Sequence, residues 1–338
     1  MAMNEFLALN GSDRQVLLEN AAEALRRPAA ILEKDIWVCW ALEALFKLET
    51  PTMVFKGGTS LSKVYGAIQR FSEDLDITID HRDSKDALLD PMAEGVSNTK
   101  RREFSERMKV FTVKTVRDTV LPHLQTLARH VPINDLRLNP DGDQILIDFQ
   151  TLSAGAYVVP SLTLEFGSRN AIEPSEIKLV EPEVLAWEQA KQLRFPSARV
   201  PVLLAERTFW EKVTLIHAEI TRRNPKANVE RYSRHWYDLA KLSLSPIGAR
   251  ALTRTDLRDH VIAVKKALFG VAGVNYDEVA TGGCRLVPDG SLAEGLARDY
   301  AAMLEAGMFD ETPAGWPELM TNLTKLEQQI NHKSSQDR

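Results

Sequence analysis

The stretch FKGGTSLSKVYGAIQRFSEDLDITID, residues 55–80, constrains the fold of this chain more than any other. A short apolar run ends in Gly57 and Gly58, and a stretch with helical spacing follows. An alternating segment then carries Asp74 and Asp76, with one residue between them. Glycine allows a tight turn after a strand, and residues two apart on a strand point to the same face. The stretch therefore predicts a strand, a helix over residues 59–71 and a second strand that carries two carboxylates on one face.

The composition is that of an ordinary globular protein. Of 338 residues, 44% are hydrophobic and 26% are charged, which suits one large domain or two of average size. No apolar run approaches the roughly 18 residues that span a bilayer, and the N-terminus lacks the features of a signal peptide. The two cysteines, Cys39 and Cys284, lie far apart, which argues against a disulfide framework. We therefore expect a cytoplasmic protein without a membrane partner.

Charge is distributed unevenly along the chain. The net charge of −5 argues against a surface covered with basic residues for nucleic acid. Two segments nevertheless carry excess positive charge, +3 over Thr99–Lys109 and +4 over Thr221–His235. Such segments are most often solvated faces, but together they could hold a polyanion.

The remaining pattern predicts an α/β half followed by a helical half. Apolar residues at three- and four-residue spacing predict helices over residues 4–25, 29–46 and 110–129. The polar residues 82–109 predict an insertion or mobile loop, and QILIDFQ and SLTLEFGSR predict strands. We expect a core over residues 1–200, with N-terminal helices, and a helical lobe over residues 201–338. The predicted helices of that lobe lie in residues 202–220, 233–244, 256–270, 291–304 and 317–331.

The paired aspartates suit a divalent cation. Two carboxylates on one strand face repel each other, and a bound cation converts the repulsion into attraction. Mg²⁺ takes hard oxygen ligands while it keeps waters and substrate phosphates. Glycines at a strand-to-helix junction let backbone N–H groups approach a phosphate. The two motifs thus suit a metal-bound nucleoside triphosphate, although GGTSLSK does not match the Walker phosphate loop. The simpler interpretation is a tight turn followed by the solvated face of an edge strand.

The order of these motifs resembles the AbiEii/AbiGii-type toxins, a branch of the nucleotidyltransferase superfamily that is related to the MenT toxins. FKGGTSLSKVY and RFSEDLDI match the central signature, with 15 residues between Gly58 and Asp74. LEKDIWV, LEFGSR, RTFWEKV, RHWYDLAKL and DYAAML match further motifs in order, so the resemblance covers about residues 30 to 330. It implies an α+β fold, with a nucleotidyltransferase-fold core (a mixed sheet with flanking helices) and a mostly helical C-terminal lobe.

The resemblance also implies roles for individual residues. Asp74 and Asp76 are expected to bind the metal, with Glu165 as the favoured third carboxylate and Asp148 as the alternative. Lys212 is expected to bind the triphosphate, and Asp238 matches a later catalytic aspartate. The expected nucleotide contacts are Gly57, Gly58, Thr59, Ser60, Lys63 and Lys212.

Several of these assignments have a structural alternative. Thr59 and Ser60 can instead cap a helix, and Lys63 can be an exposed, solvated lysine. Asp238 can form an intrahelical pair with Lys241. The charged residues of LEKDIWV are interpreted as structural.

The implied activity is Mg²⁺- or Mn²⁺-dependent transfer of a nucleotide from a nucleoside triphosphate (NTP), with release of pyrophosphate. The implied role is the toxin of a toxin–antitoxin or abortive-infection system, which modifies an RNA acceptor, expected to be tRNA, and blocks translation. A cognate antitoxin is an implied partner, and Arg222, Arg223 and Arg231 are candidates for RNA binding. Two alternatives stay open: the same enzyme acting on a protein or small molecule, and a nucleotide-binding regulator without catalysis.

Overall fold

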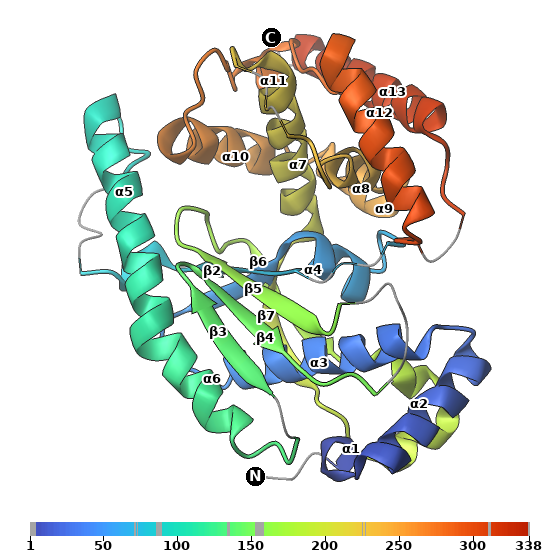
Figure 1. The fold of residues 1–338 in the computed structure, drawn as a ribbon. Coiled ribbons are helices and arrows are strands. Elements are labelled where there is room, and N and C mark those ends of the chain that lie inside the picture. The colour runs from blue at the N-terminus through green and yellow to red at the C-terminus, as the bar shows by residue number, and fades with distance from the viewer. Residues whose placement is uncertain are drawn as a thin grey trace. The chain divides into compact units, whose positions relative to one another are not determined.

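The computed structural model of the protein forms two compact units (Figure 1). The described residues are 5–70, 72, 74–85, 90–133, 136–152, 159–224, 226, 228–309 and 312–336. Unit 1 comprises residues 1–64, 73–87 and 106–202, and unit 2 comprises residues 65–72, 88–105 and 203–338. The division is therefore not a single cut near residue 200, because two earlier segments group with the C-terminal half.

Unit 1 is built on a mixed sheet, in which the described strands follow the order β3-β4-β5-β2-β1-β7-β6. Strand β2 is central: it runs antiparallel to β1 and parallel to β5. Strand β4 runs antiparallel to β3 and β5, and β1 is parallel to β7. The expected mixed sheet with flanking helices is confirmed. The strands are β1 (Met53–Lys56), β2 (Asp74–Ile79), β3 (Arg137–Asp141), β4 (Gln144–Asp148), β5 (Ser161–Gly167), β6 (Ser175–Val180) and β7 (Ala198–Leu203).

The central strands alternate apolar and polar residues, so the two faces of the sheet differ. Leu75 and Ile77 of β2 are buried and lie opposite the buried Leu164 and Phe166 of β5. Ile145 of β4 extends this apolar row beyond Leu164. Since successive residues on a strand point to opposite faces, the acidic residues of β2 lie on the other face. One face belongs to the core, and the other carries the charged groups.

Helix α3 (Ala29–Leu45) packs against β5 and is buried on nearly all sides. Its buried charged residues bind other segments of unit 1. The Glu33 carboxylate accepts a hydrogen bond from Thr151 Oγ1 (2.8 Å), and Lys34 Nζ donates to the backbone carbonyl of Val159 (2.8 Å). Burying a charge is costly unless it is hydrogen-bonded, so these contacts stabilise the chain path around α3. They agree with the structural role predicted for LEKDIWV.

Two predictions near the motifs differ from the structure. The helix expected over residues 59–71 is α4 (Gly57–Lys63), which ends before Gly66, a residue with φ of +57°. The loop expected over residues 82–109 is partly helical, because α5 (Asn98–Thr115) begins there and buries Met108. A π-helical turn (Val116–Val120) joins α5 to α6 (Leu121–Ala128). The N-terminal helices are α1 (Glu5–Ala8) and α2 (Gly11–Leu25), and three short 3-10 turns span His81–Asp83, Glu183–Ala186 and Glu188–Gln192.

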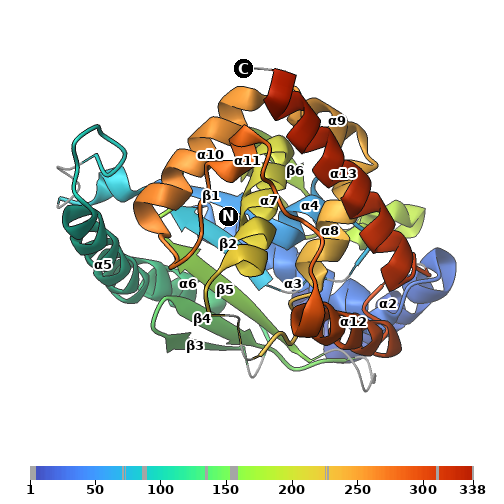
Figure 2. The same cartoon turned by 90° about the horizontal axis from the view of Figure 1, so that it is seen from above.

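The C-terminal part of unit 2 is helical, as expected (Figure 2). Helix α7 packs against α8, α9 and α10, and α13 packs against α8 and α11. None of the described helices combines the length and apolarity needed to cross a membrane. The helices are α7 (Ala205–Thr221), α8 (Arg234–Ser243), α9 (Pro246–Ala251), α10 (Thr255–Leu268), α11 (Glu278–Thr281), α12 (Gly290–Glu305) and α13 (Trp316–Gln336), of which α9 and α11 were not predicted.

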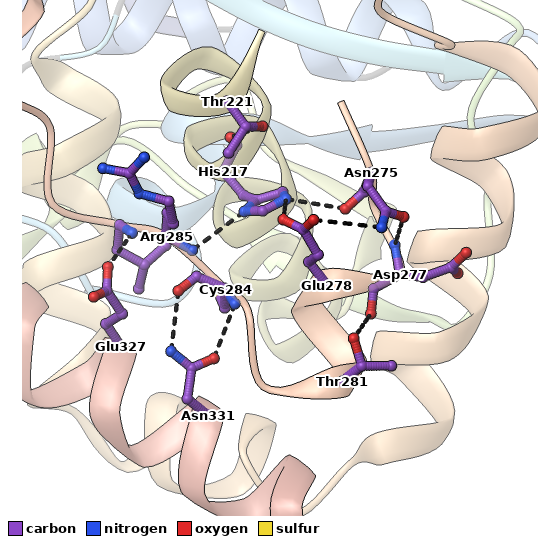
Figure 3. A network of polar contacts seen from close by, with 11 residues as sticks. His217, Thr221, Asn275, Asp277, Glu278, Thr281, Cys284, Arg285, Glu327 and Asn331 are labelled. Carbon is purple, nitrogen blue, oxygen red and sulfur yellow. Dashed lines mark hydrogen bonds and ion pairs between the residues drawn. The ribbon is translucent and has the colours of Figure 1, made fainter. Parts of the chain in front are cut away.

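A polar network connects α7 to later segments of unit 2 (Figure 3). The backbone N–H of Arg285 donates to His217 Nδ1 (3.2 Å), so the ring proton lies on Nε2, which donates to the carbonyl of Asn275 (3.1 Å). Asn331 of α13 bonds both backbone groups of Cys284 (2.9 and 3.0 Å). Burial lowers the pKa of His217 below its ordinary value, which keeps the ring neutral.

Lowering the pH should therefore reduce the free energy of unfolding. His217 resists protonation in the folded protein, but its ring gains a proton in the unfolded chain. The contribution of neutral His217 to the free energy of unfolding is complete above the pKa of an unfolded-chain histidine, about 6.5. It is lost as the pH falls below that value, by at most about 1.4 kcal/mol per pH unit. Urea unfolding at about pH 5.5 and about pH 7.5 measures this loss. His217→Gln should make the loss smaller, because the amide keeps a donor and an acceptor but does not titrate.

The matched control is His332→Gln, which changes an exposed histidine of α13 and should leave the pH dependence unchanged. Equal pH dependence in wild type and His217→Gln would contradict the prediction.

Candidate active site

The register of the sheet places four polar side chains in one row across its charged face. Asp76 of β2 lies opposite Lys56 of β1 on one side and opposite Glu165 of β5 on the other. Gln144 of β4 lies opposite Glu165, and its Nε2 donates to Glu165 Oε1 (3.2 Å). Residues directly opposite each other share a face and lie about 5 Å apart. We call Lys56, Asp76, Glu165 and Gln144 the polar row, and all four are half-buried.

Asp148 lies on the same face but away from this row. It pairs with Ser161, four residues before Glu165 on β5, which corresponds to about 14 Å along the strand. Its Oδ2 accepts a hydrogen bond from the side chain of Asn139 (2.7 Å). The register therefore favours Glu165 over Asp148 as the carboxylate that acts with Asp76.

Asp74 lies on the same face one row away from Asp76, opposite Thr163. In the part of the chain that the structure describes, no three His, Cys, Asp or Glu side chains converge on a point where a metal ion could bind. Asp76 and Glu165 are thus the adjacent carboxylate pair. The role of Asp74 as a further metal ligand stays a prediction.

Gly57 brings the chain backbone directly against Asp76. Its φ is +81°, in the left-handed region that side chains rarely adopt. A Cβ on Gly57 would lie 1.9 Å from Asp76 Oδ2 and 2.9 Å from Asp76 Cβ. Glycine is therefore required by both conformation and space. Gly58 follows as the second residue of α4.

The hydroxyls of Thr59 and Ser60 bind within the protein. Thr59 Oγ1 donates to the backbone carbonyl of Asp74 (2.5 Å), and Ser60 Oγ donates to that of Gly57 (2.9 Å). Both residues are buried. They also do not cap α4, whose N-cap residue is Lys56. The Thr59 hydroxyl holds the turn against β2, and the Ser60 hydroxyl bonds within the turn. Contact of either hydroxyl with a nucleotide stays a prediction.

Lys63 was expected to contact phosphate or, alternatively, to be a solvated surface lysine, but the structure shows its side chain buried and bonded within unit 1. Its Nζ donates to Asp35 Oδ1 (2.5 Å) and to the carbonyl of Glu181 (2.9 Å), and its side chain is 6% exposed. Desolvation, the largest single influence, would lower the pKa of Lys63, but the charge and hydrogen bond of Asp35 together with contributions from Cys39 and Glu183 outweigh it, and the pKa is raised. These contacts favour a structural role.

In unit 2, Lys212 of α7 and Asp238 of α8 form a buried ion pair. Lys212 Nζ lies 2.7 Å from Asp238 Oδ2, and Arg70 donates to both carboxylate oxygens of Asp238 (2.6 and 2.8 Å). Desolvation would raise the pKa of Asp238, but the charges of Arg70 and Lys212 outweigh it and the pKa is lowered. The contacts that hold Asp238 are thus those with Arg70 and Lys212, and not the intrahelical pair with Lys241 that was the structural alternative.

The predicted RNA-binding arginines differ in how they are held. Arg222 Nη1 donates to both carboxylate oxygens of Glu219 (3.0 and 2.9 Å), whereas the side chain of Arg223 is exposed. The backbone N–H of Arg231 donates to Asp299 (2.6 Å). Arg223 is therefore the most accessible of the three to an external anion.

Sequence reasoning missed Lys56, Gln144 and Arg70. Lys56 immediately precedes the glycine pair and Arg70 belongs to the RFSEDLD motif, so both positions were available to sequence analysis. Gln144 had no such signal, because its place depends on the register between β4 and β5.

Gly57→Ala should destabilise the protein more than Gly142→Ala. Gly142, in the turn between β3 and β4, also has a positive φ of +61°, but a Cβ there meets nothing within 4 Å. Strain from φ alone costs about 1–2 kcal/mol in each variant, and the clash with Asp76 adds to it only at Gly57. The free energy of unfolding in urea measures the difference, and equal losses would contradict the close approach to Asp76.

Comparisons with known proteins show the family of the chain. The family model described as "Nucleotidyl transferase AbiEii toxin, Type IV TA system" matches residues 40–322. Among solved structures, MenT4, a nucleotidyltransferase toxin from Mycobacterium tuberculosis H37Rv, has a TM-score of 0.51 at 18% identity, with 93% of this chain and 89% of MenT4 covered. JHP933 from Helicobacter pylori has a TM-score of 0.44 at 18% identity, with 91% and 94% covered. No curated protein sequence matches the chain.

The similarity to MenT4 shows a shared fold. The family model spans most of the chain and confirms the resemblance drawn from the motifs. This protein therefore belongs to the AbiEii family of nucleotidyltransferase toxins of type IV toxin–antitoxin systems.

Proposed function

We propose that this protein is a metal-dependent nucleotidyltransferase that transfers a nucleotide from an NTP to an RNA acceptor, with tRNA as the expected class. As a toxin, it would block translation in this way, and a cognate antitoxin would restrain it. The observation that carries the proposal is the polar row, in which Asp76 and Glu165 lie opposite each other beside the tight turn at Gly57. Family membership supports the transferase class.

The polar row fits Mg²⁺ or Mn²⁺. Both are hard cations, and Mg²⁺ is usually held by one or two carboxylates, with waters and substrate phosphates as the remaining ligands. Asp76 and Glu165 supply such a pair, and Asp74 extends it along β2. The absence of a Cβ at Gly57 lets the Asp76 carboxylate lie directly against the backbone of the turn. When bound, the metal would lower the pKa of an acceptor hydroxyl and neutralise phosphate charge.

The residues of the chain would orient the reactants. Backbone N–H groups at Gly57 and Gly58 are available to approach phosphate oxygens, because neither residue carries a side chain. Gln144 would hold the Glu165 carboxylate in place through its hydrogen bond. Lys212, in unit 2, would offer a point charge to the leaving pyrophosphate. In the reaction, the acceptor hydroxyl would lose its proton and its oxygen would form a bond to the α-phosphorus. The bond between that phosphorus and the oxygen that bridges to the β-phosphorus would break, which releases pyrophosphate.

Removing either carboxylate of the pair should strongly reduce the rate of transfer while the fold is retained. Asp76→Asn and Glu165→Gln keep the side-chain size but remove the charge that would bind the metal, and we expect a rate loss of about 10²–10³-fold. The measurement is transfer of label from each α-³²P NTP to total RNA with Mg²⁺. Asp148→Asn is the matched control on the same sheet face and should retain near-wild-type transfer.

The same assay separates the alternative functions. Label on protein or metabolites, but not on RNA, would overturn the RNA acceptor and leave the transferase. Mg²⁺-dependent nucleotide binding without pyrophosphate release on any acceptor would instead support a non-catalytic regulator.

Removing basic residues from Thr221–His235 should weaken RNA binding. We expect Arg223→Gln combined with Arg231→Gln to reduce the slope of log affinity against log salt by about 1 for each phosphate that the variant no longer neutralises. Filter binding of tRNA over a range of salt concentrations measures the slope. Arg298→Gln, which changes an exposed arginine of α12, serves as the control. A slope unchanged from wild type would exclude this segment from the RNA interface.

A further inference from the structure

Arg70, Asp238 and Lys212 form one buried cluster within unit 2. Arg70 Nε donates to Asp238 Oδ1 (2.6 Å), its second nitrogen donates to Oδ2 (2.8 Å), and Lys212 Nζ lies 2.7 Å from the same Oδ2. The exposed fractions of the three side chains are 3% for Arg70, 0% for Asp238 and 9% for Lys212. Lys212 is thus the member of the cluster that reaches furthest toward solvent.

We propose that Arg70 is a positioning residue, which fixes the ammonium group of Lys212 through the Asp238 carboxylate that both share. The proposal rests on the role of Lys212 in binding the triphosphate. It also gives Asp238 a positioning role, because a carboxylate with no exposed surface does not reach a substrate.

The chemistry of the three groups explains why Arg70 positions and Lys212 is positioned. A guanidinium that bonds both oxygens of a carboxylate fixes its plane as well as its position. A lysine ammonium ends a flexible chain of four carbons and has no preferred direction of its own. Because Arg70 sets the position of Oδ2, it also sets the place at which the Lys212 ammonium rests.

The backbone that carries Arg70 is itself anchored within unit 2. Arg70 forms an isolated antiparallel β-bridge with Phe309, and Tyr65 Oη donates to the carbonyl of Leu203 (3.0 Å). Residues 65 and 70 are therefore each anchored by a contact within unit 2. Both lie in the sequence between the glycine pair and Asp74.

A buried ion pair can also be purely structural, and a kinetic double-mutant cycle distinguishes the two roles. The variants are Arg70→Met, Lys212→Met and the double variant. If Arg70 acts through Lys212, Arg70→Met should lower kcat/KM at least about tenfold in the wild-type background and cause no further loss in Lys212→Met. Asp238→Asn should behave in the same way. Arg70→Lys, which keeps the charge without the bidentate bond, should recover part of the activity.

The matched control is Arg207→Met on the same helix as Lys212. Arg207 is also buried, and it contacts Glu211 (3.4 Å) and His260 (2.9 Å) instead of Asp238. The fold-loss in kcat/KM of the Arg207→Met, Lys212→Met double variant should equal the product of the two single fold-losses. Thermal unfolding of every variant confirms that the compared proteins are folded at the assay temperature, and Arg70→Lys replaces Arg70→Met in the cycle if the latter does not fold.

Multiplicative effects of Arg70→Met and Lys212→Met would overturn the inference while leaving the proposed function intact. If the wild type transfers no nucleotide, the same cycle is run on the dissociation constant of Mg²⁺–NTP. If the wild type neither transfers a nucleotide nor binds NTP, the proposed function and the inference are both overturned.

Discussion

The pairing of β2 with its two neighbours determines where the charged groups of the candidate site lie. Its antiparallel register with β1 sets Asp76 beside Lys56, and its parallel register with β5 sets Asp76 beside Glu165. A shift by one residue would turn the acidic residues into the core and the buried leucine and isoleucine residues to the charged face. The apolar face of the sheet, which packs against α3, therefore fixes the register and with it the carboxylate pair.

The two units use charge in different ways. In unit 1, Asp76 and Glu165 are half-buried on adjacent strands with Lys56 opposite Asp76, so positive charge lies beside the carboxylate pair and the side chains stay partly open to solvent. In unit 2, the Asp238 carboxylate is buried between two cationic side chains, whose attraction offsets its desolvation. The first arrangement suits binding of a ligand, and the second suits holding a side chain in place.

Predictability from sequence followed the strength of the local pattern. Helices α7 and α10 and strand β5 have clear periodicity, α3 is a long and mainly apolar segment, and the structure contains each of them. Strands β3, β6 and β7 were not predicted: β3 and β6 lie at the edges of the sheet, and the last residues of β7 (Ala198–Leu203) fell within the helix expected over residues 202–220. The Asp-Gly pair at the β3–β4 turn was a usable hairpin signal. The helix expected over residues 59–71 was too long because apolar spacing continues past Lys63. In the structure α4 ends at Lys63, and Gly66 has a positive φ.

The sequence by itself determined the family, the order of the motifs and which residue types could carry the chemistry, because these depend on residues close together in the chain. Only the tertiary structure decided which of those residues meet. It placed Glu165 rather than Asp148 beside Asp76, turned Lys63 toward Asp35, and joined Arg70 to Asp238 across 168 positions of sequence. The physical reason is that strand register and helix packing are set by burial of apolar side chains from the whole chain, which no local motif encodes.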